Sequence, residues 1–299
     1  MNSTNELQKT ADQRALQKEQ NLRTLMRGMD SVLVAYSGGV DSSYLALIAT
    51  QELGKNAICI SGISPSVSEE QISQASQTAD QFGFQFESID TNEMADPNYT
   101  SNPANRCYFC KSELYKKLSE IAFLRGIGNL VDGANQDDFS DYRPGKQAAD
   151  ENSIGSPLAE VGFTKDEIRI RSREHGLQTW DKPASPCLSS RIQYGVPVSI
   201  ERLSKIEKGE IVLRDLGFRE FRVRYHDHDL VRIEISKSEF AKAIEPEVHQ
   251  MITASFRKLG IKYITLDLDG FRSGSMNEIL PKKTSTEDSS NSYINRVDK

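Results

Sequence analysis

The stretch at residues 31–53, SVLVAYSGGVDSSYLALIATQEL, decides the fold. Residues 31–36 form a short apolar run, which is typical of a strand at the centre of a parallel sheet. Residues 41–53 have the composition of a helix, and Gly38 and Gly39 lie between the two elements. Glycine lets backbone N–H groups approach an anion, and the helix dipole favours negative charge. This order of elements therefore predicts a phosphate site.

Polar side chains in the loop support this interpretation. Three serines add hydroxyl donors, and Asp41 is the only acid in the loop. A carboxylate would repel bare phosphate, so we assign Asp41 to a Mg²⁺ ion that accompanies the nucleotide. A plain turn between a strand and a helix is the alternative. The predicted nucleotide-binding residues are Ser37, Gly38, Gly39, Val40, Asp41, Ser42 and Ser43.

The same loop resembles the SGGxDS signature of the PP-loop ATP pyrophosphatases. It is not a Walker A loop, because the pattern GxxxxGK[ST] is absent. The resemblance implies that ATP and Mg²⁺ bind here and that ATP is cleaved between its α and β phosphates. It also implies that a substrate oxygen is adenylated, with AMP and pyrophosphate as products.

Strands and helices alternate through the first half of the chain. We expect further strands at 57–62, 84–90 and 129–133, and a helix at 68–82. This order indicates an α/β fold with a doubly wound parallel sheet. Ligands in such folds gather at the carboxyl ends of the strands.

A smaller α/β unit is predicted in the second half, after a stretch rich in Pro, Gly and Ser. It contains helices at about 199–216 and 245–259, a hairpin made of FRVRYH and LVRIEI, and a final strand, KYITLDL. The polar tail is predicted to be disordered. The predicted segments are an N-terminal helix or frayed segment (1–28), the nucleotide domain (29–176), an inter-domain crossing (177–198), the substrate domain (199–280) and the tail (281–299).

Composition limits the function classes. The chain has 299 residues, of which 37% are hydrophobic and 27% charged, as in soluble globular proteins. There is no apolar run of the ~20 residues that span a bilayer and no signal-peptide core at the N-terminus, so we expect a cytoplasmic protein without membrane contact. The net charge of −6 argues against a nucleic-acid partner.

Two of the four cysteines lie in the motif CYFC, as Cys107 and Cys110. At positions i and i+3 of a predicted helix, their sulfurs share one face. Such a pair can be a redox dithiol, half of a zinc site or part of an iron–sulfur site. A zinc site would need two more ligands with suitable geometry, and the sequence has no second CxxC.

Cys187, in the segment PASPCLSSR, is the candidate that would complete a set of three. It lies in the predicted crossing, which can fold back over the carboxyl edge of the sheet. Three thiolates with one open position suit a four-iron cluster with one exposed iron. Cys59 lies inside the predicted strand at 57–62, and we expect it to be a buried core residue.

Several arginines are candidates for binding an anionic substrate. Arg222 and Arg224 are two residues apart on a predicted strand and therefore share a face, and Arg232 on the neighbouring strand can join them. A solvated, charged sheet edge is the alternative. Arg191 and Arg272 are further candidates. The acids and histidines at 226–229 can bind a metal, although a turn explains them more simply.

Acidic residues also follow the predicted strand at 129–133. Crowded carboxylates repel one another unless a cation intervenes, so we expect them to help bind Mg²⁺ or to hold the loop by salt bridges. Gly133 is expected to let the backbone approach AMP. The residues in this loop are Asp137, Asp138, Asp141, Tyr142 and Arg143.

Taken in order, a series of segments resembles the LarE family of ATP-dependent sulfur transferases. That family acts in the synthesis of the nickel-pincer nucleotide, the cofactor of lactate racemase. The likeness runs from about residue 31 to 278. The segments that carry it are SGGVDSS, VDGANQDDFSDYRPG, WDKPASPCLSSRIQYG, RVRYH and YITLDLDGFRSGSMNE.

The family has two chemical versions, and the resemblance favours one of them. In one version a single cysteine gives up its sulfur and becomes dehydroalanine, and no cluster is needed. In the other, three cysteines hold a four-iron four-sulfur cluster that carries the sulfide. Pro186 stands at the place of the sacrificial cysteine, one residue before Cys187. This offset, together with CYFC, implies the cluster version, with Cys107, Cys110 and Cys187 as ligands.

The resemblance also implies a substrate and a reaction. The family substrate is a pyridinium mononucleotide with two carboxylates, which are adenylated and converted to thiocarboxylates. Glu210 and Glu234 match family positions near this substrate, and the family forms hexamers. Three alternatives stay open: a tRNA thiolation enzyme of the same superfamily, an ammonia-using ligase such as an NAD or GMP synthetase, and a non-catalytic nucleotide-binding protein.

Overall fold

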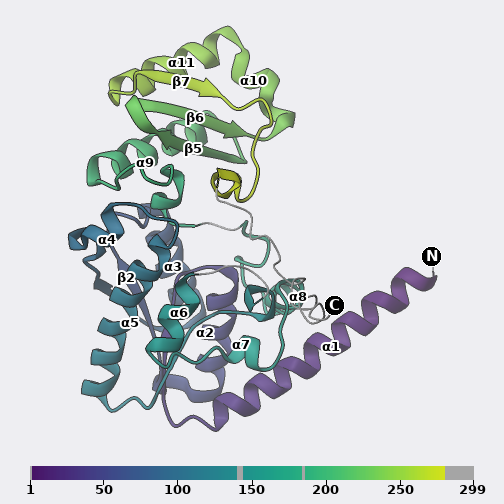
Figure 1. Ribbon diagram of the computed structural model, residues 1–299. Coiled ribbons are helices and arrows are strands. Elements are labelled where there is room, and N and C mark those ends of the chain that lie inside the picture. The colour runs from purple at the N-terminus through teal and green to yellow at the C-terminus, as the bar shows by residue number, and fades with distance from the viewer. Residues whose placement is uncertain (1, 140–143, 184–185, 280–299) are drawn as a thin grey trace, which may run out of the picture.

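The computed structural model describes residues 2–139, 144–183 and 186–279, and side chains from residue 12 onward. Its central sheet has four parallel strands in the order β3-β2-β1-β4, and a second sheet has three strands in the order β5-β6-β7 (Figure 1). The predicted α/β class with a parallel central sheet is therefore confirmed. The strands are β1 (Val32–Ala35), β2 (Ala57–Ile63), β3 (Gln85–Asp90), β4 (Asn129–Val131), β5 (Phe221–His226), β6 (Leu230–Ile235) and β7 (Tyr263–Leu266).

Helices cover both faces of the central sheet. Side chains alternate along a strand, so Val32 and Val34 pack into one apolar cluster and Leu33 into another on the opposite face. The helices of the first half are α1 (Asn2–Arg27), α2 (Val40–Leu53), α3 (Glu69–Phe82), α4 (Pro97–Thr100), α5 (Arg106–Arg125), α6 (Pro144–Glu151), α7 (Pro157–Glu160) and α8 (Lys165–Glu174).

The second sheet is mixed. β5 and β6 pair antiparallel, and β6 and β7 pair parallel. A hairpin joins β5 to β6, as predicted, and its turn holds His228 and Asp229 at φ values of 59° and 54°. The helices of this half are α9 (Ile200–Asp215), α10 (Phe240–Ile244) and α11 (Pro246–Lys258).

The crossing between the two sheets folds back onto the first half of the chain, as the sequence predicted. Leu188 donates its backbone N–H to the carbonyl of Ser66 at 2.8 Å. Tyr99 of α4 is fully buried in the same apolar cluster as Leu188 and the core of the second sheet. The crossing is therefore packed between the two sheets, above the carboxyl edge of the first (Figure 1).

Helix α1 extends beyond the rest of the molecule at its N-terminal end (Figure 1). Its C-terminal part packs on α2 and α8, where Leu22 and Met26 are fully buried. Among the described residues, no helix combines the length and the apolar character that crossing a membrane requires. The expected tail at 281–299 lies outside the described residues, and the predicted domain boundaries stay predictions.

Candidate functional site

The predicted nucleotide loop joins β1 to α2 and has the geometry of an anion site. Gly38 has a φ of 67°, which suits glycine, and a Cβ there would lie 2.7 Å from the Cβ of Ala75. Ser42 accepts a hydrogen bond from the backbone N–H of Ser37 at 3.2 Å. Gly39 caps α2, so the N-terminus of a 14-residue helix faces the loop.

Gly133 contacts this loop from the end of β4. A Cβ at Gly133 would lie 2.8 Å from the backbone nitrogen of Ser42 and 3.0 Å from its Cα. The sequence predicted that Gly133 lets the backbone approach AMP. The structure also explains sterically why glycine stands at this position. A side chain there would push the end of β4 away from the nucleotide loop.

Two lysines that the sequence did not single out converge on the loop. Nζ of Lys165, the first residue of α8, lies 2.6 Å from Oδ2 of Asp41. Lys182 of the crossing donates to the carbonyl of Gly38 at 3.3 Å, and burial lowers the pKa of its ammonium group. The loop therefore has two cations beside it, supplied from residues more than 120 positions away.

The acidic residues after β4 bond to nearby backbone. Asp137 accepts from the N–H of Lys165 at 2.8 Å, and Asp138 accepts from the N–H of Asn135 at 3.1 Å. These backbone hydrogen bonds hold the loop in place, while the salt bridges and the Mg²⁺ role that the sequence suggested stay predictions. Asp141, Tyr142 and Arg143 lie outside the described residues.

The three predicted cysteine ligands lie together. Cys107 and Cys110 occupy the first turn of α5, and both interact electrostatically with Cys187 at the start of the 3₁₀ turn Leu188–Arg191. All three are free thiols. Burial and then the neighbouring Cys187 raise the pKa of Cys110. Cys59, by contrast, is fully buried in β2, as expected, and burial raises its pKa to about 12.

A buried polar chain runs beside the cysteines. Ser64 and Ser66, which follow β2, donate to Oε1 of Glu93 at 2.5 and 3.0 Å. Tyr99 hydrogen-bonds to Ser66 at 2.7 Å and to Ser189 at 2.5 Å. The chain links the carboxyl ends of β2 and β3 to the segment that follows Cys187, so it helps to hold that cysteine over the sheet edge.

Asn102 fixes the crossing above the CYFC helix. It is fully buried and has a φ of 57°, and its amide donates to the carbonyls of Gln193 at 2.7 Å and Val196 at 2.8 Å. Arg106 in turn donates to the Asn102 side-chain oxygen. Because Arg106 precedes Cys107, this clamp ties the first pair of cysteines to the segment that carries the third.

The arginines form a buried, paired cluster at the start of the second sheet. Arg191 makes two hydrogen bonds to Glu210, at 3.0 and 3.2 Å, and Arg224 bonds to Oε2 of Glu234 at 3.0 Å. These four residues are at most 7% exposed. Arg222 lies near Arg191 and Arg224, and burial followed by these two arginines lowers its pKa to about 10. The alternative of a solvated, charged sheet edge is therefore wrong for Arg224, which is 5% exposed.

Arg232 and Arg272 join the rim of this cluster. Arg232 bonds to Oε1 of Glu234 at 3.2 Å and also pairs with Asp267. Arg272 lies 3.3 Å from the other oxygen of Asp267. Arg191 also donates to the carbonyl of Cys187 at 3.0 Å. The cluster is thus in direct contact with the third cysteine of the set.

The chain is similar to a known family and to several known proteins. The NAD synthase family model matches residues 16–106, which include the nucleotide loop. The uncharacterized protein slr1717 of Synechocystis sp. is 45% identical over 89% of this chain and 98% of its own length. The pyridinium-3,5-bisthiocarboxylic acid mononucleotide synthase of Lactiplantibacillus plantarum is 32% identical over 89% of this chain and 95% of its own length. The chain belongs to the LarE family.

A second relative of unknown activity, the uncharacterized protein MJ0830 of Methanocaldococcus jannaschii, is 30% identical over 81% of this chain and 91% of its own length. Membership of the LarE family makes the chain an ATP-using sulfur transferase of the PP-loop class.

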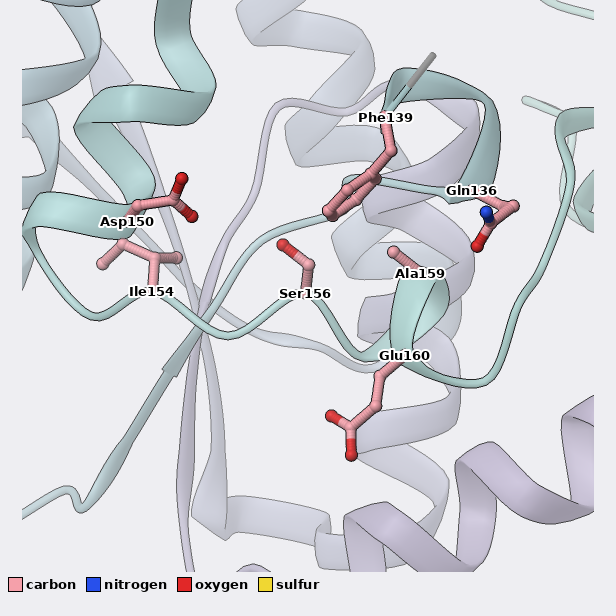
Figure 2. A pocket seen from close by; sticks show the side chains of 7 residues that line it. All are labelled: Gln136, Phe139, Asp150, Ile154, Ser156, Ala159 and Glu160. Atoms are coloured by element: carbon pink, nitrogen blue, oxygen red, sulfur yellow. The ribbon is translucent and has the colours of Figure 1, made fainter.

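Two cavities among the described residues lie outside the candidate site of this LarE family member. One, of about 310 Å³, lies beside β4 and is lined by Phe139, Asp150, Ser156 and Glu160 among others (Figure 2). The other, of about 320 Å³, is an apolar groove between α10, α11 and the second sheet. Neither cavity is lined by a cysteine or by a serine of the nucleotide loop. The candidate site is therefore defined by the chemistry of its side chains and not by a cavity.

Proposed function

We propose that the protein adenylates the carboxylates of a pyridinium dicarboxylate mononucleotide with ATP and converts them to thiocarboxylates, in the synthesis of a nickel-pincer nucleotide cofactor. The observation that carries the proposal is the meeting of three free thiols, from CYFC and the crossing, at the carboxyl edge of the PP-loop sheet. The buried arginine cluster touches the same segment. The name of the Lactiplantibacillus relative supports the identity of the substrate.

The first half-reaction takes place at the nucleotide loop. A substrate carboxylate oxygen attacks the α-phosphate of ATP, the bond between the α and β phosphates breaks, and pyrophosphate leaves. Asp41 would bind Mg²⁺, which the carboxylate beside a phosphate loop suits. The N–H groups at the start of α2 and the hydroxyls of Ser37 and Ser42 stabilise the negative charge that develops on pyrophosphate.

The arginine cluster binds the substrate phosphate and the second carboxylate. Three arginines, Arg191, Arg222 and Arg224, face two carboxylates, Glu210 and Glu234. Each glutamate already fixes one guanidinium in place, so little side-chain entropy is lost when the anion arrives. The excess positive charge in a buried site favours a ligand with several negative charges.

The second half-reaction replaces oxygen by sulfur. Hydrosulfide attacks the acyl-adenylate carbonyl, the carbon–oxygen bond to AMP breaks, and AMP leaves while one proton is released. When bound, a four-iron four-sulfur cluster would supply that sulfide from an iron that no protein ligand occupies. Cys107, Cys110 and Cys187 would hold it.

The number and type of donors, three cysteines, are what such a cluster would need. Among the described residues, no three His, Cys, Asp or Glu side chains converge on a point where one metal ion would sit. A four-iron cluster would need three cysteine thiolates and one open position, and the set Cys107, Cys110 and Cys187 would supply the thiolates. Cys107 is exposed, whereas Cys110 and Cys187 are half-buried, which leaves the site open on one side.

The test is an anaerobic assay with ATP, the dicarboxylate mononucleotide and sulfide. We expect a coloured protein after reconstitution with iron and sulfide, many turnovers per chain, and one AMP and one pyrophosphate for each thiocarboxylate. Mass spectrometry should find the peptide of Cys187 unchanged. A colourless protein that works once and loses hydrogen sulfide from Cys187 would refute cluster delivery, and ATP use without thiocarboxylate would refute the proposed reaction.

A further inference from the structure

The contact between Lys165 and Asp41 places a cation where the nucleotide loop needs one. Nζ of Lys165 lies 2.6 Å from Oδ2 of Asp41, which is the residue assigned to Mg²⁺. The backbone N–H of Lys165 donates to Asp137 at 2.8 Å, so the start of α8 is fixed beside the loop. The ammonium group therefore occupies one side of the Asp41 carboxylate.

This ion pair contributes little to folding. The side chains of Lys165 and Asp41 are 35% and 22% exposed. Ion pairs of this kind stabilise a fold only slightly, because water competes for both charges and two side chains lose freedom. Stability is therefore a weak reason for a lysine at this position, and the anion-binding loop beside it offers a stronger one.

We infer that Lys165 takes the place of Mg²⁺ in the nucleotide-free protein and moves to the β- and γ-phosphates when ATP brings the metal to Asp41. The inference rests on the proposed binding of Mg-ATP at this loop. An ammonium group and a divalent cation beside the same carboxylate repel each other, so the binding of one weakens the binding of the other. The displaced ammonium then lies next to the newly bound phosphates and pairs with them.

Two consequences follow for binding. Metal alone binds weakly to the empty site, because it must displace Lys165 without offering the ammonium a new partner. Metal together with ATP binds tightly, because the phosphates accept the displaced ammonium. The residue thereby makes the loop select the metal–nucleotide complex over the free metal.

Lys182 provides a contrast on the same loop. It donates to the carbonyl of Gly38 at 3.3 Å and thus contacts the glycine turn of the loop. A phosphate role for Lys182 would therefore affect ATP binding without changing the affinity for free metal. Only the loss of Lys165 is expected to strengthen the binding of free metal and at the same time to weaken the binding of the metal–ATP complex.

The experiment uses Mn²⁺ as the metal probe and equilibrium binding as the readout. In Lys165→Met without nucleotide, electron paramagnetic resonance should show Mn²⁺ binding about tenfold more tightly than in the wild type, because a competing positive charge is gone. Calorimetry should show Mg-ATP binding about tenfold to a hundredfold more weakly, because a charge-assisted phosphate contact is lost. Lys165→Arg keeps the positive charge and should bring the affinities for Mn²⁺ and for Mg-ATP part of the way back to the wild-type values.

Lys116→Met, at an exposed position on α5, is the control and should match the wild type in both measurements. Lys182→Met should leave Mn²⁺ binding unchanged. Unchanged Mn²⁺ affinity in Lys165→Met, or unchanged Mg-ATP affinity, would overturn the inference. Neither measurement requires turnover, so an absence of thiocarboxylate in the assay above would refute the proposed reaction and leave this test intact.

Discussion

The nucleotide loop and the cysteine–arginine site are built in different ways. The loop is one contiguous segment, residues 37–43, whose shape follows from a strand, two glycines and a helix start. The second site combines Cys107, Cys187 and Arg224, which lie far apart in the sequence and on three different elements. A contiguous site depends mainly on local backbone geometry, whereas an assembled site depends on every contact that holds its segments together.

This difference implies that the two half-reactions can be separated by mutation. The crossing is held over the sheet edge by a few buried polar groups, chiefly Asn102 and Tyr99. Damage to these contacts should disturb sulfur transfer and substrate binding while the nucleotide loop keeps its geometry. Four predictions test this separation, in order of decreasing effect.

The largest effect is expected for Cys110→Ala. A cluster left with two protein thiolates exposes two irons and should be labile, so colour and thiocarboxylate formation should be lost. ATP–pyrophosphate exchange that depends on the carboxylate substrate should persist, because the loop is untouched. Cys59→Ala, at a buried cysteine outside the site, is the control. If Cys110→Ala still formed thiocarboxylate and Cys187 became dehydroalanine, the cysteines of CYFC would have no role in sulfur transfer.

The next effect concerns the clamp that joins the two cysteine segments. Asn102→Ala removes two short hydrogen bonds to buried carbonyls and also strains a residue at a φ of 57°. We expect a loss of about 3 kcal/mol in the free energy of unfolding, measured with urea, and weaker cluster retention. Asn102→Gly relieves the backbone strain but not the lost bonds, so the difference between the variants isolates the strain. If both Asn102 variants lost ATP binding to the same extent as cluster retention, the two sites would not be separable by mutation.

The sequence predicts the contiguous site well and the assembled one only in part. The SGGVDSS segment determines its own geometry, so Gly38 and Ser42 could be assigned from local pattern alone. The three cysteines could be chosen as a set, but the contact between them depends on Asn102, whose partners lie about 90 residues further on. An Asn-Pro pair indicates a turn and gives no sign of such partners.

The lysines show the same limit. Nothing in the local sequence distinguishes Lys165 from the other lysines at helix starts, because its function depends on how α8 packs beside the loop. Similarly, the arginine pattern predicted a shared strand face but not the burial of Glu234, which lies between Arg224 and Arg232. Long-range packing decides both features, and no period or spacing in one sequence records it.

A smaller effect is expected for Arg224→Ala. The lost charge-assisted contact to the substrate costs about 1.5–3 kcal/mol, so KM for the mononucleotide should rise about tenfold to a hundredfold. ATP affinity should change little, because Arg224 belongs to the assembled site. The charge left on buried Glu234 adds a folding cost, and Arg224→Lys, which keeps the charge, controls for it. Equal weakening of ATP and mononucleotide binding would contradict the separation.

The smallest effect tests whether the contiguous site also relies on distant contacts. Glu19 of α1 is 4% exposed and accepts hydrogen bonds from Tyr44 of α2 at 2.8 Å and from Arg171 of α8 at 2.7 Å. Burial alone would raise the pKa of Glu19, but donors that include His175 and Arg171 outweigh it and hold the pKa well below its usual range. The helix that follows the nucleotide loop is thus joined to α1 and α8 by one buried carboxylate.

The sign of the pH effect follows from this lowered pKa. A carboxyl group whose folded pKa lies below its unfolded value stabilises the fold above the unfolded pKa, and the stabilisation is lost as the pH falls further. Between about pH 5 and pH 3.5, Glu19 should therefore account for a loss of about 1 kcal/mol in the free energy of unfolding. Urea unfolding should show this loss in the wild type and in Glu201→Gln, an exposed acid, but not in Glu19→Gln. If all three proteins lose the same free energy of unfolding between about pH 5 and pH 3.5, Glu19 does not contribute this stabilisation. The nucleotide loop would then depend on local geometry alone.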